Sequence, residues 1–256
     1  MNQQLHFITF GGPSNNYHDA LDRICKQAKS FNIFSTITGY NEKDLQDDNN
    51  FWIKHGNFIQ NNSRGYGYWL WKPYLILKKL KEINDNDILL YLDAGCELNT
   101  DGKEYFINKL IPLTNEKKII GTRGGSNDLN FTKKDLVIFT EMEKSPLLSC
   151  DHMQPGTLMM KKCNIINKLI EEYYSVASNN YNLLDDSPSV AKNHESFIEH
   201  RHDQSIFNML IKKYNLLNYD MEPSYWGTNP SNYKLGFNYP IWSCRNKTGL
   251  SLKSIF

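Results

Sequence analysis

The chain has 256 residues, of which 40% are hydrophobic and 22% are charged. This length and composition predict a soluble globular protein and exclude a disordered or fibrous one. Its 29 Lys and Arg residues balance 28 Asp and Glu residues, so no long-range field gathers nucleic acid or an anionic membrane around it.

The sequence predicts neither a targeting segment nor a membrane span. No apolar run approaches the roughly 18 residues of a membrane span, and the initial MNQQLHFITF lacks the basic and cleavage regions of a signal peptide. The five cysteines are scattered and form no CxxC pair, which argues against a zinc knuckle or a redox dithiol. We therefore expect a cytoplasmic protein with free thiols.

The first part of the chain predicts strands that alternate with helices. Its segment DILLYL at 87–92 is apolar throughout, so we expect a strand buried on both faces. Pro73 suits the first turn of a helix that follows RGYGYWLWK. The elements expected here are strands at 5–10, 33–38 and 87–92, a helix at 17–31, a polar stretch around 47–50 and the helix that begins near Pro73.

The second part continues the alternation. We expect helices at 103–111, 132–142, 164–176 and 203–214, strands at 118–122 and 157–160, and a polar loop at 178–194. The glycine-rich segment 121–125 lacks the spacing of a phosphate-binding loop, so we predict a surface turn there. The pattern predicts one α/β domain over 1–256, with a mostly parallel sheet, helices on both faces and an irregular tail from about 221 to 256.

Ligands of open α/β sheets lie beyond the carboxyl ends of the strands. Asp93 follows the most apolar strand, where a carboxylate is costly unless it binds a cation or accepts hydrogen bonds. It is therefore a candidate for function, the alternative being a cap of a turn. Residues 9–12 form the end of the first strand and the turn after it, and Phe10 there either lies against a base or belongs to a plain tight turn.

The densest polar cluster, HESFIEHRHDQS, spans 194–205. Asp203 stands at a predicted helix start, where a carboxylate can cap the helix. A metallohydrolase built on Glu199, His200, His202 and Asp203 is an alternative, although an HxH pair does not by itself supply three convergent metal ligands.

Five segments together resemble a nucleotide-sugar glycosyltransferase of the GT-A type, whose Rossmann-like sheet binds a nucleoside diphosphate sugar. They are LHFITFG, RGYGYWLWKP, YLDAGCELN, QPGTLMMKK and EHRHDQSIFNML, in an order that covers most of 5–220. The chain looks most like polysaccharide-type glycosyltransferases with a HRHDQS motif. The DQxxxN pattern also resembles the helix start of glycogenin-like retaining enzymes.

The resemblance implies transfer of a sugar from a nucleoside diphosphate sugar, such as a UDP-sugar, to a glycan or other hydroxyl acceptor, with retention favoured. A catalytically silent relative that binds nucleotide or glycan is the alternative. The implied catalytic residues are Asp203 and Gln204. The implied donor-binding residues are Thr9, Phe10, Gly11, Arg64, Lys72, Asp93, Ala94 and Gly95, and the acceptor-side residues are Gly156, Thr157, His200 and His202.

The resemblance also implies a divalent cation, Mn²⁺ or Mg²⁺, held by Asp93 as the first Asp of a DxD motif. Gly95 replaces the second Asp, and no histidine follows His202, so we expect any metal to be weakly held. Glu97 is one possible substitute ligand. Alternatively, basic side chains neutralise the diphosphate without metal, the candidates being Arg64, Lys72, Arg245 and Lys247. We expect Trp69 and Trp71 to pack under the sheet.

Overall fold

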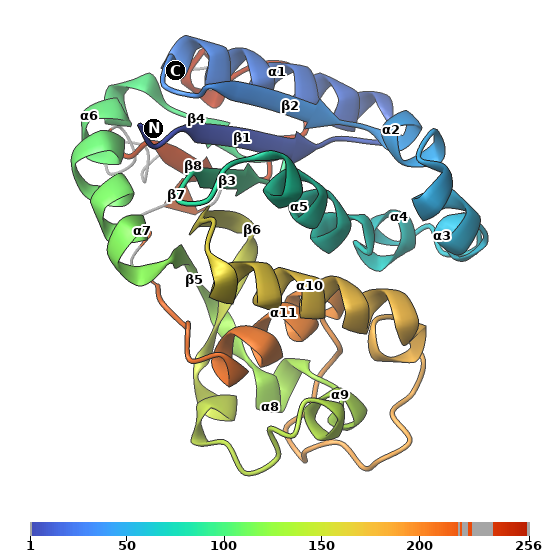
Figure 1. Cartoon of the computed structure of the whole chain (residues 1–256). Coiled ribbons are helices and arrows are strands. Elements are labelled where there is room, and N and C mark those ends of the chain that lie inside the picture. The colour runs from blue at the N-terminus through green and yellow to red at the C-terminus, as the bar shows by residue number, and fades with distance from the viewer. Residues whose placement is uncertain (1, 220, 222–224, 227–237, 255–256) are drawn as a thin grey trace.

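A computed structural model describes residues 2–219, 221, 225–226 and 238–254. Its centre is a five-stranded sheet in the order β2-β1-β3-β6-β5 (Figure 1). The strands are β1 (Leu5–Phe10), β2 (Thr36–Tyr40), β3 (Ile88–Leu92), β5 (Ile119–Asn127) and β6 (Asp151–Lys161). β1 pairs in parallel with β2 and β3, whereas β6 runs antiparallel to both of its neighbours. The predicted mostly parallel α/β sheet is confirmed.

Helices cover both faces of this sheet (Figure 1). One face carries α1 (Asn15–Phe31), α6 (Lys103–Tyr105), the π-helix η2 (Phe106–Leu110) and α7 (Ile111–Lys117). The other carries α3 (Asn49–Asn61), α5 (Trp71–Glu82), α10 (Asn164–Asn179) and α11 (His202–Lys213). Side chains of β3 alternate between the two cores, with Leu90 in the first and Leu89 in the second. The strand is therefore buried on both faces, as its apolar sequence predicts.

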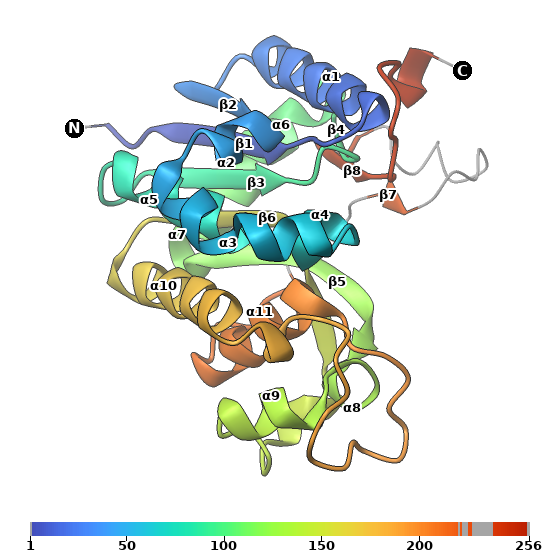
Figure 2. The ribbon, with the colours of Figure 1, turned by 90° about the vertical axis from the view of Figure 1, so that its right-hand side faces the viewer.

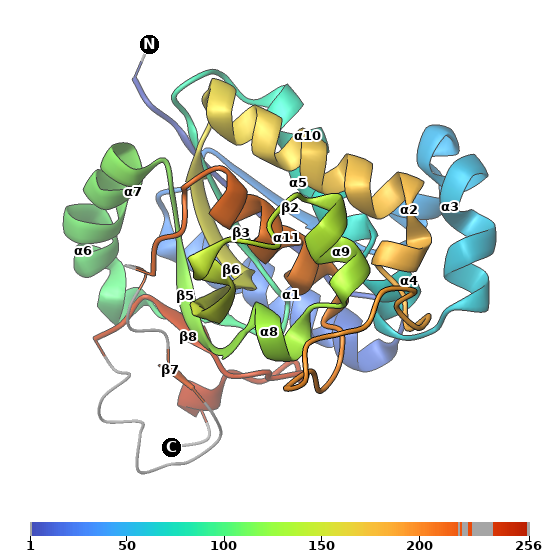
Figure 3. The ribbon, with the colours of Figure 1, turned by 90° about the horizontal axis from the view of Figure 1, so that it is seen from below.

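Shorter elements complete the described part of the chain. They are α2 (Glu42–Gln46), α4 (Gly65–Tyr68), η1 (Thr100–Gly102), α8 (Asp128–Phe131), α9 (Lys134–Phe139), η3 (Pro146–Ser149), η4 (Tyr181–Leu183) and η6 (Leu252–Ser254). α8 and α9 pack beside α11 (Figure 3). A second sheet joins β4 (Glu97–Leu98) to β8 (Ile241–Ser243) and β7 (Tyr225–Trp226).

Two predicted segments differ from the structure. The expected turn at 121–125 is part of β5. Thr122 and Gly124 are buried while Arg123 and Gly125 are exposed, which is the alternation of a strand. Pairing with β6 outweighs the low strand propensity of glycine here. The polar stretch around 47–50 opens α3, whose Asn-rich sequence is a poor helix former. Asp48 caps it by accepting a hydrogen bond from the Phe51 amide.

Other boundaries shift without changing the order of elements. The helix expected at 103–111 continues to Lys117, and the one expected at 132–142 is the shorter α9, which the separate helix α8 precedes. β7 and β8 lie within the expected irregular tail, part of which falls outside the described residues. The single-domain organisation over 1–256 stays a prediction.

The described residues contain no helix that is both long and apolar enough to cross a membrane. All five cysteines are free thiols. Cys96 and Cys244 are buried, and burial raises the pKa of both thiols, that of Cys244 to about 12. These two thiols are therefore poor nucleophiles at neutral pH.

Candidate active site

A cleft of about 710 Å³ opens at the carboxyl ends of β1 and β3. The chain leaves β1 towards β2 on one side and returns to β3 on the other, so this is the switch point at which open α/β sheets bind ligands. Figure 2 shows β1 and β3 running towards the side of the molecule that carries α4 and β8. Of the fourteen residues implied as catalytic, donor-binding or acceptor-side, ten line the cleft: Phe10, Arg64, Lys72, Asp93, Ala94, Gly95, Gly156, His202, Asp203 and Gln204.

Three charged side chains from three elements meet in this cleft. Lys72 Nζ of α5 lies 2.9 Å from Asp203 Oδ2 of α11 and 3.4 Å from Asp93 Oδ1, directly after β3. The side chains of Lys72 and Asp203 are buried, whereas that of Asp93 is 45% exposed. Asp93 is therefore the carboxylate of this cluster that is open to a ligand.

Tyrosine hydroxyls and one glycine hold the two carboxylates. The Tyr91 hydroxyl donates to Asp93 Oδ1 at 2.6 Å, and the Tyr173 hydroxyl donates to Asp203 Oδ2 at 3.3 Å. The Asp93 amide donates to the carbonyl of Gly156 at 2.9 Å. A Cβ at Gly156 would lie 2.5 Å from Asp93 Oδ2, so a glycine on β6 is needed for this position of Asp93.

The pKa values follow from burial and from this pairing. Burial alone would lower the pKa of Lys72, but the charges of Asp203 and Asp93 raise it above its ordinary value. Lys72 therefore stays protonated. Burial raises the pKa of Asp203, and the Lys72 ammonium offsets part of this effect. Asp203 makes no cap of α11, because its carboxylate contacts Lys72 and Tyr173 instead.

Four residues proposed from sequence do not line the cleft. Thr9 is buried, and its hydroxyl has no hydrogen-bond partner among the described residues. Gly11 is packed under α1, where a Cβ would lie 2.4 Å from the Tyr17 carbonyl oxygen. The Thr157 hydroxyl donates to Thr122 Oγ1 in the sheet. His200 is buried between the Lys133 amide and the Leu183 carbonyl.

The two histidines of the HRHDQS motif do not converge on a metal. His200 Nε2 donates to the Leu183 carbonyl and His202 Nδ1 donates to that of Leu184. Burial lowers the pKa of both imidazoles. The metallohydrolase alternative therefore receives no support from these residues. His202 Nε2 makes no hydrogen bond within the described residues, although it lines the cleft.

The residues around Asp93 do not form a metal site on their own. Asp93 Oδ1 already accepts from Tyr91 and contacts Lys72. Gly95 stands where a DxD motif has its second Asp. A Cβ there would lie 3.2 Å from Arg245 Cα, and the Gly95 carbonyl accepts a hydrogen bond from the Asn246 backbone amide. The described residues hold no group of three His, Cys, Asp or Glu side chains placed to bind a metal, so a cation here would need ligands from a substrate.

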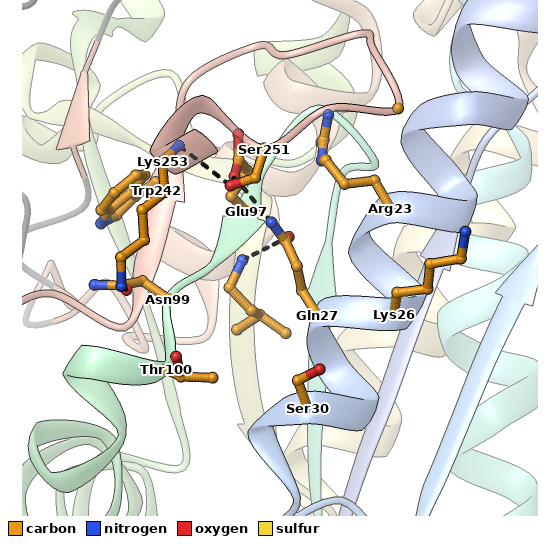
Figure 4. Close-up of a pocket in the computed structure, with 12 residues that line it drawn as sticks. Arg23, Lys26, Gln27, Ser30, Glu97, Asn99, Thr100, Trp242, Ser251 and Lys253 are labelled. Atoms are coloured by element: carbon orange, nitrogen blue, oxygen red, sulfur yellow. Dashed lines mark hydrogen bonds between the residues drawn. The ribbon is translucent and has the colours of Figure 1, made fainter. Parts of the chain in front are cut away.

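Glu97 does not face the cleft, which overturns its candidacy as a substitute ligand. It is 1% exposed and lines a separate pocket of about 310 Å³ with Gln27 and Ser251 (Figure 4). Its carboxylate accepts from the Gln27 amide at 2.9 Å and the Ser251 hydroxyl at 2.6 Å. The Asn246 side chain and the Leu252 amide occupy its other oxygen. Glu97 thus holds the C-terminal segment against α1.

One wall of the cleft is a turn of left-handed helix at 65–69. All five residues have positive φ, from 52° at Tyr66 to 80° at Gly67, and the Trp69 amide donates to the Gly65 carbonyl at 3.1 Å. Such a run is costly for L-residues and needs surrounding structure to hold it. A Cβ on Gly67 would lie 2.6 Å from Ile59 Cγ1 of α3.

The left-handed turn gives the cleft an aromatic wall. Tyr66 and Trp69 are half-buried and line it. Trp71 is 5% exposed and packs in the core beside the sheet, as predicted, with its ring stacked on Phe10 at a centroid distance of 4.0 Å. The half-buried Trp69 lines the cleft instead of packing fully under the sheet. The Phe10 ring is 4% exposed and supports the wall instead of presenting a free stacking face.

Basic side chains surround the mouth. Arg64 pairs with Asp186 at 3.1 Å, and Arg201 stacks on Phe131. Arg245 and Lys247, both exposed, come from the C-terminal segment, and no carboxylate of the described residues lies within 4.0 Å of them. Counted with Lys72, the described lining has five cationic side chains against three carboxylates, which favours an anionic ligand.

Several lining residues were missed from the sequence. Gln154 precedes the predicted strand in QPGTLMMKK, and Ser243 lies in β8. Arg201 belongs to the HRHDQS motif that was singled out for its neighbours. A strand that begins six residues earlier than expected brings Gln154 to the cleft, and apolar periodicity alone does not reveal such an extension.

Comparisons with known proteins give distant structural likenesses. No protein-family model and no curated protein sequence match the chain. A glycosyltransferase involved in glycosylation of the major capsid of PBCV-1 has 9% identity and a TM-score of 0.41, over 69% of this chain and 68% of that one. Mouse xyloside xylosyltransferase 1 has 9% identity and a TM-score of 0.48, over 97% of this chain and 100% of that one. Galactosyltransferase LgtC, in complex with donor and acceptor sugar analogs, has 14% identity and a TM-score of 0.39, over 92% of this chain and 86% of that one. Likenesses this weak carry no information on substrate or mechanism.

Proposed function

We propose that the chain is a GT-A type glycosyltransferase that moves a sugar, in the manner of a hexosyltransferase, from a nucleoside diphosphate sugar to a hydroxyl acceptor. The observation that carries the proposal is the Asp93–Lys72–Asp203 cluster in a cationic cleft at the switch point of the sheet. The assignment to the GT-A class rests on the resemblance of the sequence motifs to that class.

The charges of the cleft suit the proposed donor. Transfer breaks the bond between the anomeric carbon and the diphosphate oxygen, so negative charge collects on the departing nucleotide. Arg245, Lys247 and Arg64 stand at the cleft mouth, where their positive charges would stabilise that negative charge. Lys72 is buried between two carboxylates, and we assign it to holding them. A UDP-sugar is the donor class favoured by the sequence resemblance.

The sugar would lie over Asp93, Asp203 and Gln204. Asp93 has an exposed carboxylate for sugar hydroxyls, and Gln204 lines the cleft beside it. A new bond forms from the acceptor oxygen to the anomeric carbon, and the acceptor hydroxyl loses its proton. Inversion requires a free carboxylate base for that proton. Asp93 and Asp203 both contact the Lys72 ammonium, so neither is a free base; this favours retention, with the departing phosphate taking the proton.

The acceptor side is assigned to Gly156 and His202. His202 Nε2 makes no hydrogen bond within the described residues, its nearby group being the Asp186 carboxylate at 3.6 Å, itself an acceptor; a buried acceptor of this kind is costly unless a ligand satisfies it. A glycan hydroxyl would do so, which is compatible with a role in polysaccharide biosynthesis. We propose that Mn²⁺ or Mg²⁺, if it takes part, arrives with the diphosphate, because Asp93 alone is a weak ligand set.

A thermal-shift screen tests the function. Nucleoside diphosphate sugars of several bases are added with and without Mn²⁺, and the release of nucleoside diphosphate is then followed with a panel of sugar acceptors. A ligand at 100 times its Kd stabilises the folded state by about 2.7 kcal/mol. We expect a sugar nucleotide to raise the melting temperature of wild type, and Asp93→Asn to remain folded but respond less. No response to any sugar nucleotide overturns the proposal, and binding without release indicates the catalytically silent relative.

A further inference from the structure

Gln204 is tied to a buried charged network that faces away from the cleft. Its amide nitrogen lies 3.1 Å from His152 Nδ1, and His152 Nε2 lies 2.8 Å from Asp128 Oδ1. Asp128 Oδ2 is 2.5 Å from Lys212 Nζ of α11. The exposed fractions of His152, Asp128 and Lys212 are 0%, 1% and 2%, so the network is shielded from bulk solvent.

The partners fix the proton on His152. Burial alone would raise the pKa of Asp128, but His152 and Lys212 lower it below its ordinary value, so Asp128 is a carboxylate that only accepts. Nε2 of His152 must therefore carry a proton. Lys212 balances the charge of Asp128 on its other oxygen. The Gln204 amide nitrogen faces Nδ1 of His152, which is the accepting nitrogen of an imidazole whose Nε2 donates.

An accepting Nδ1 determines how the Gln204 amide is turned. Only the NH₂ group can donate to it, so the amide nitrogen faces His152 and the carbonyl oxygen Oε1 is left for the cleft. Ser126 Oγ, 3.3 Å from the amide nitrogen, can donate or accept and so does not select the orientation. The imidazole does.

We propose that His152, set by Asp128, is a positioning residue that fixes the Gln204 amide so that its carbonyl oxygen faces the cleft and accepts a hydrogen bond from a substrate hydroxyl. The substrate part rests on the proposed function, whereas the orientation does not. A site arranged in this way favours a sugar hydroxyl over a phosphate oxygen at Gln204, because a phosphate oxygen offers no proton.

Ring NMR of ¹⁵N-histidine-labelled protein tests the orientation without any ligand. The signals of His152 are assigned by their loss in His152→Asn. At neutral pH we expect Nε2 to carry the proton and Nδ1 to resonate as an unprotonated acceptor. A proton on Nδ1 overturns the proposal, because the Gln204 amide would then present its nitrogen to the cleft.

Two isosteric variants test the consequence for binding. His152→Asn can keep an acceptor near the position of Nδ1, whereas His152→Gln can keep a donor near that of Nε2 and loses the contact to Gln204. Using the sugar nucleotide that gives the largest thermal shift and its sugar-free diphosphate, we expect His152→Gln to weaken only the sugar nucleotide, by about three- to tenfold. His152→Asn and the control Ser126→Ala should change it less than twofold. If His152→Gln loses equal affinity for both nucleotides, or loses none, the positioning role is contradicted. If wild type binds no sugar nucleotide, the proposed function fails, and the NMR test still decides the orientation of the Gln204 amide.

Discussion

Lys72 Nζ lies 2.9 Å from Asp203 Oδ2, and this buried contact joins α5 to α11 across the floor of the cleft. The pair fixes the positions of a cation and a carboxylate whose side chains are only 3% and 6% exposed. Asp93, which is 3.4 Å from the same ammonium, completes the cluster on its solvent side. The stability of the fold and the chemistry of the cleft therefore depend on the same residues.

Removing the Lys72 ammonium should destabilise the protein in a pH-dependent way. Lys72→Met leaves Asp203 buried without its partner, which costs about 3–5 kcal/mol when the carboxylate is charged. The pKa of Asp203 is already raised by burial and rises further in the variant. A carboxyl whose pKa is raised in the folded state stabilises below its ordinary pKa and loses that stabilisation as pH rises through the folded pKa.

The melting temperature of Lys72→Met, relative to wild type, should therefore be lower at about pH 7 than at about pH 5. The double variant Lys72→Met with Asp203→Asn removes both charges and should recover much of the loss. Differential scanning calorimetry across this range checks the prediction. A pH-independent deficit that the second substitution does not relieve would mean that Lys72 acts through packing alone.

Gly156 tests whether the position of Asp93 matters to ligand binding. A Cβ there would lie 2.5 Å from Asp93 Oδ2, so Gly156→Ala must displace a half-exposed carboxylate that can move at small cost in stability. We expect an affinity loss of about tenfold for the sugar nucleotide, equivalent to about 1.4 kcal/mol, with little change in melting temperature. Gly125→Ala is the matched control, because its Cβ would meet no atom within 4 Å. Equal affinities of the two variants would contradict the assignment.

The left-handed turn at 65–69 should be sensitive to its central glycine. Gly67 has a φ of 80°, and its missing Cβ leaves room for Ile59. Gly67→Ala should lower the free energy of unfolding by about 1–3 kcal/mol, measured by urea denaturation beside Gly125→Ala. A loss no larger than that of the control would show that the turn is not held under strain.

Much of this architecture could be predicted from the sequence. The apolar strand before Asp93 and the HRHDQS segment at a helix start both indicated residues that line the cleft. The contact between Lys72 and Asp203 could not be predicted, because it joins two helices distant in the chain, and a helix-start aspartate equally suggests a cap. Left-handed backbone at Tyr66, Tyr68 and Trp69 opposes local preference, so it follows from tertiary packing. The buried partners of Gln204 carry no sequence signal either.

The ligand set of Asp93 gives a direct expectation for metal binding. With Gly95 against the C-terminal segment and Asp93 Oδ1 already paired, the nucleotide-free protein offers Mn²⁺ few oxygens. Isothermal titration calorimetry should show no tight stoichiometric site without nucleotide, and any heat in the presence of nucleoside diphosphate should fall in Asp93→Asn. A tight site in the nucleotide-free protein would count against this account.

The central claim is that the cluster around Asp203 acts on the sugar of a nucleoside diphosphate sugar. Asp203→Asn keeps the side-chain shape and leaves Asp93 beside Lys72, so we expect the variant to remain folded. The most direct test is the rate of nucleoside diphosphate release from the preferred donor with its acceptor, measured for wild type and Asp203→Asn at saturating donor. The account predicts a fall of about a hundredfold or more. Release at the wild-type rate by the folded variant would contradict it.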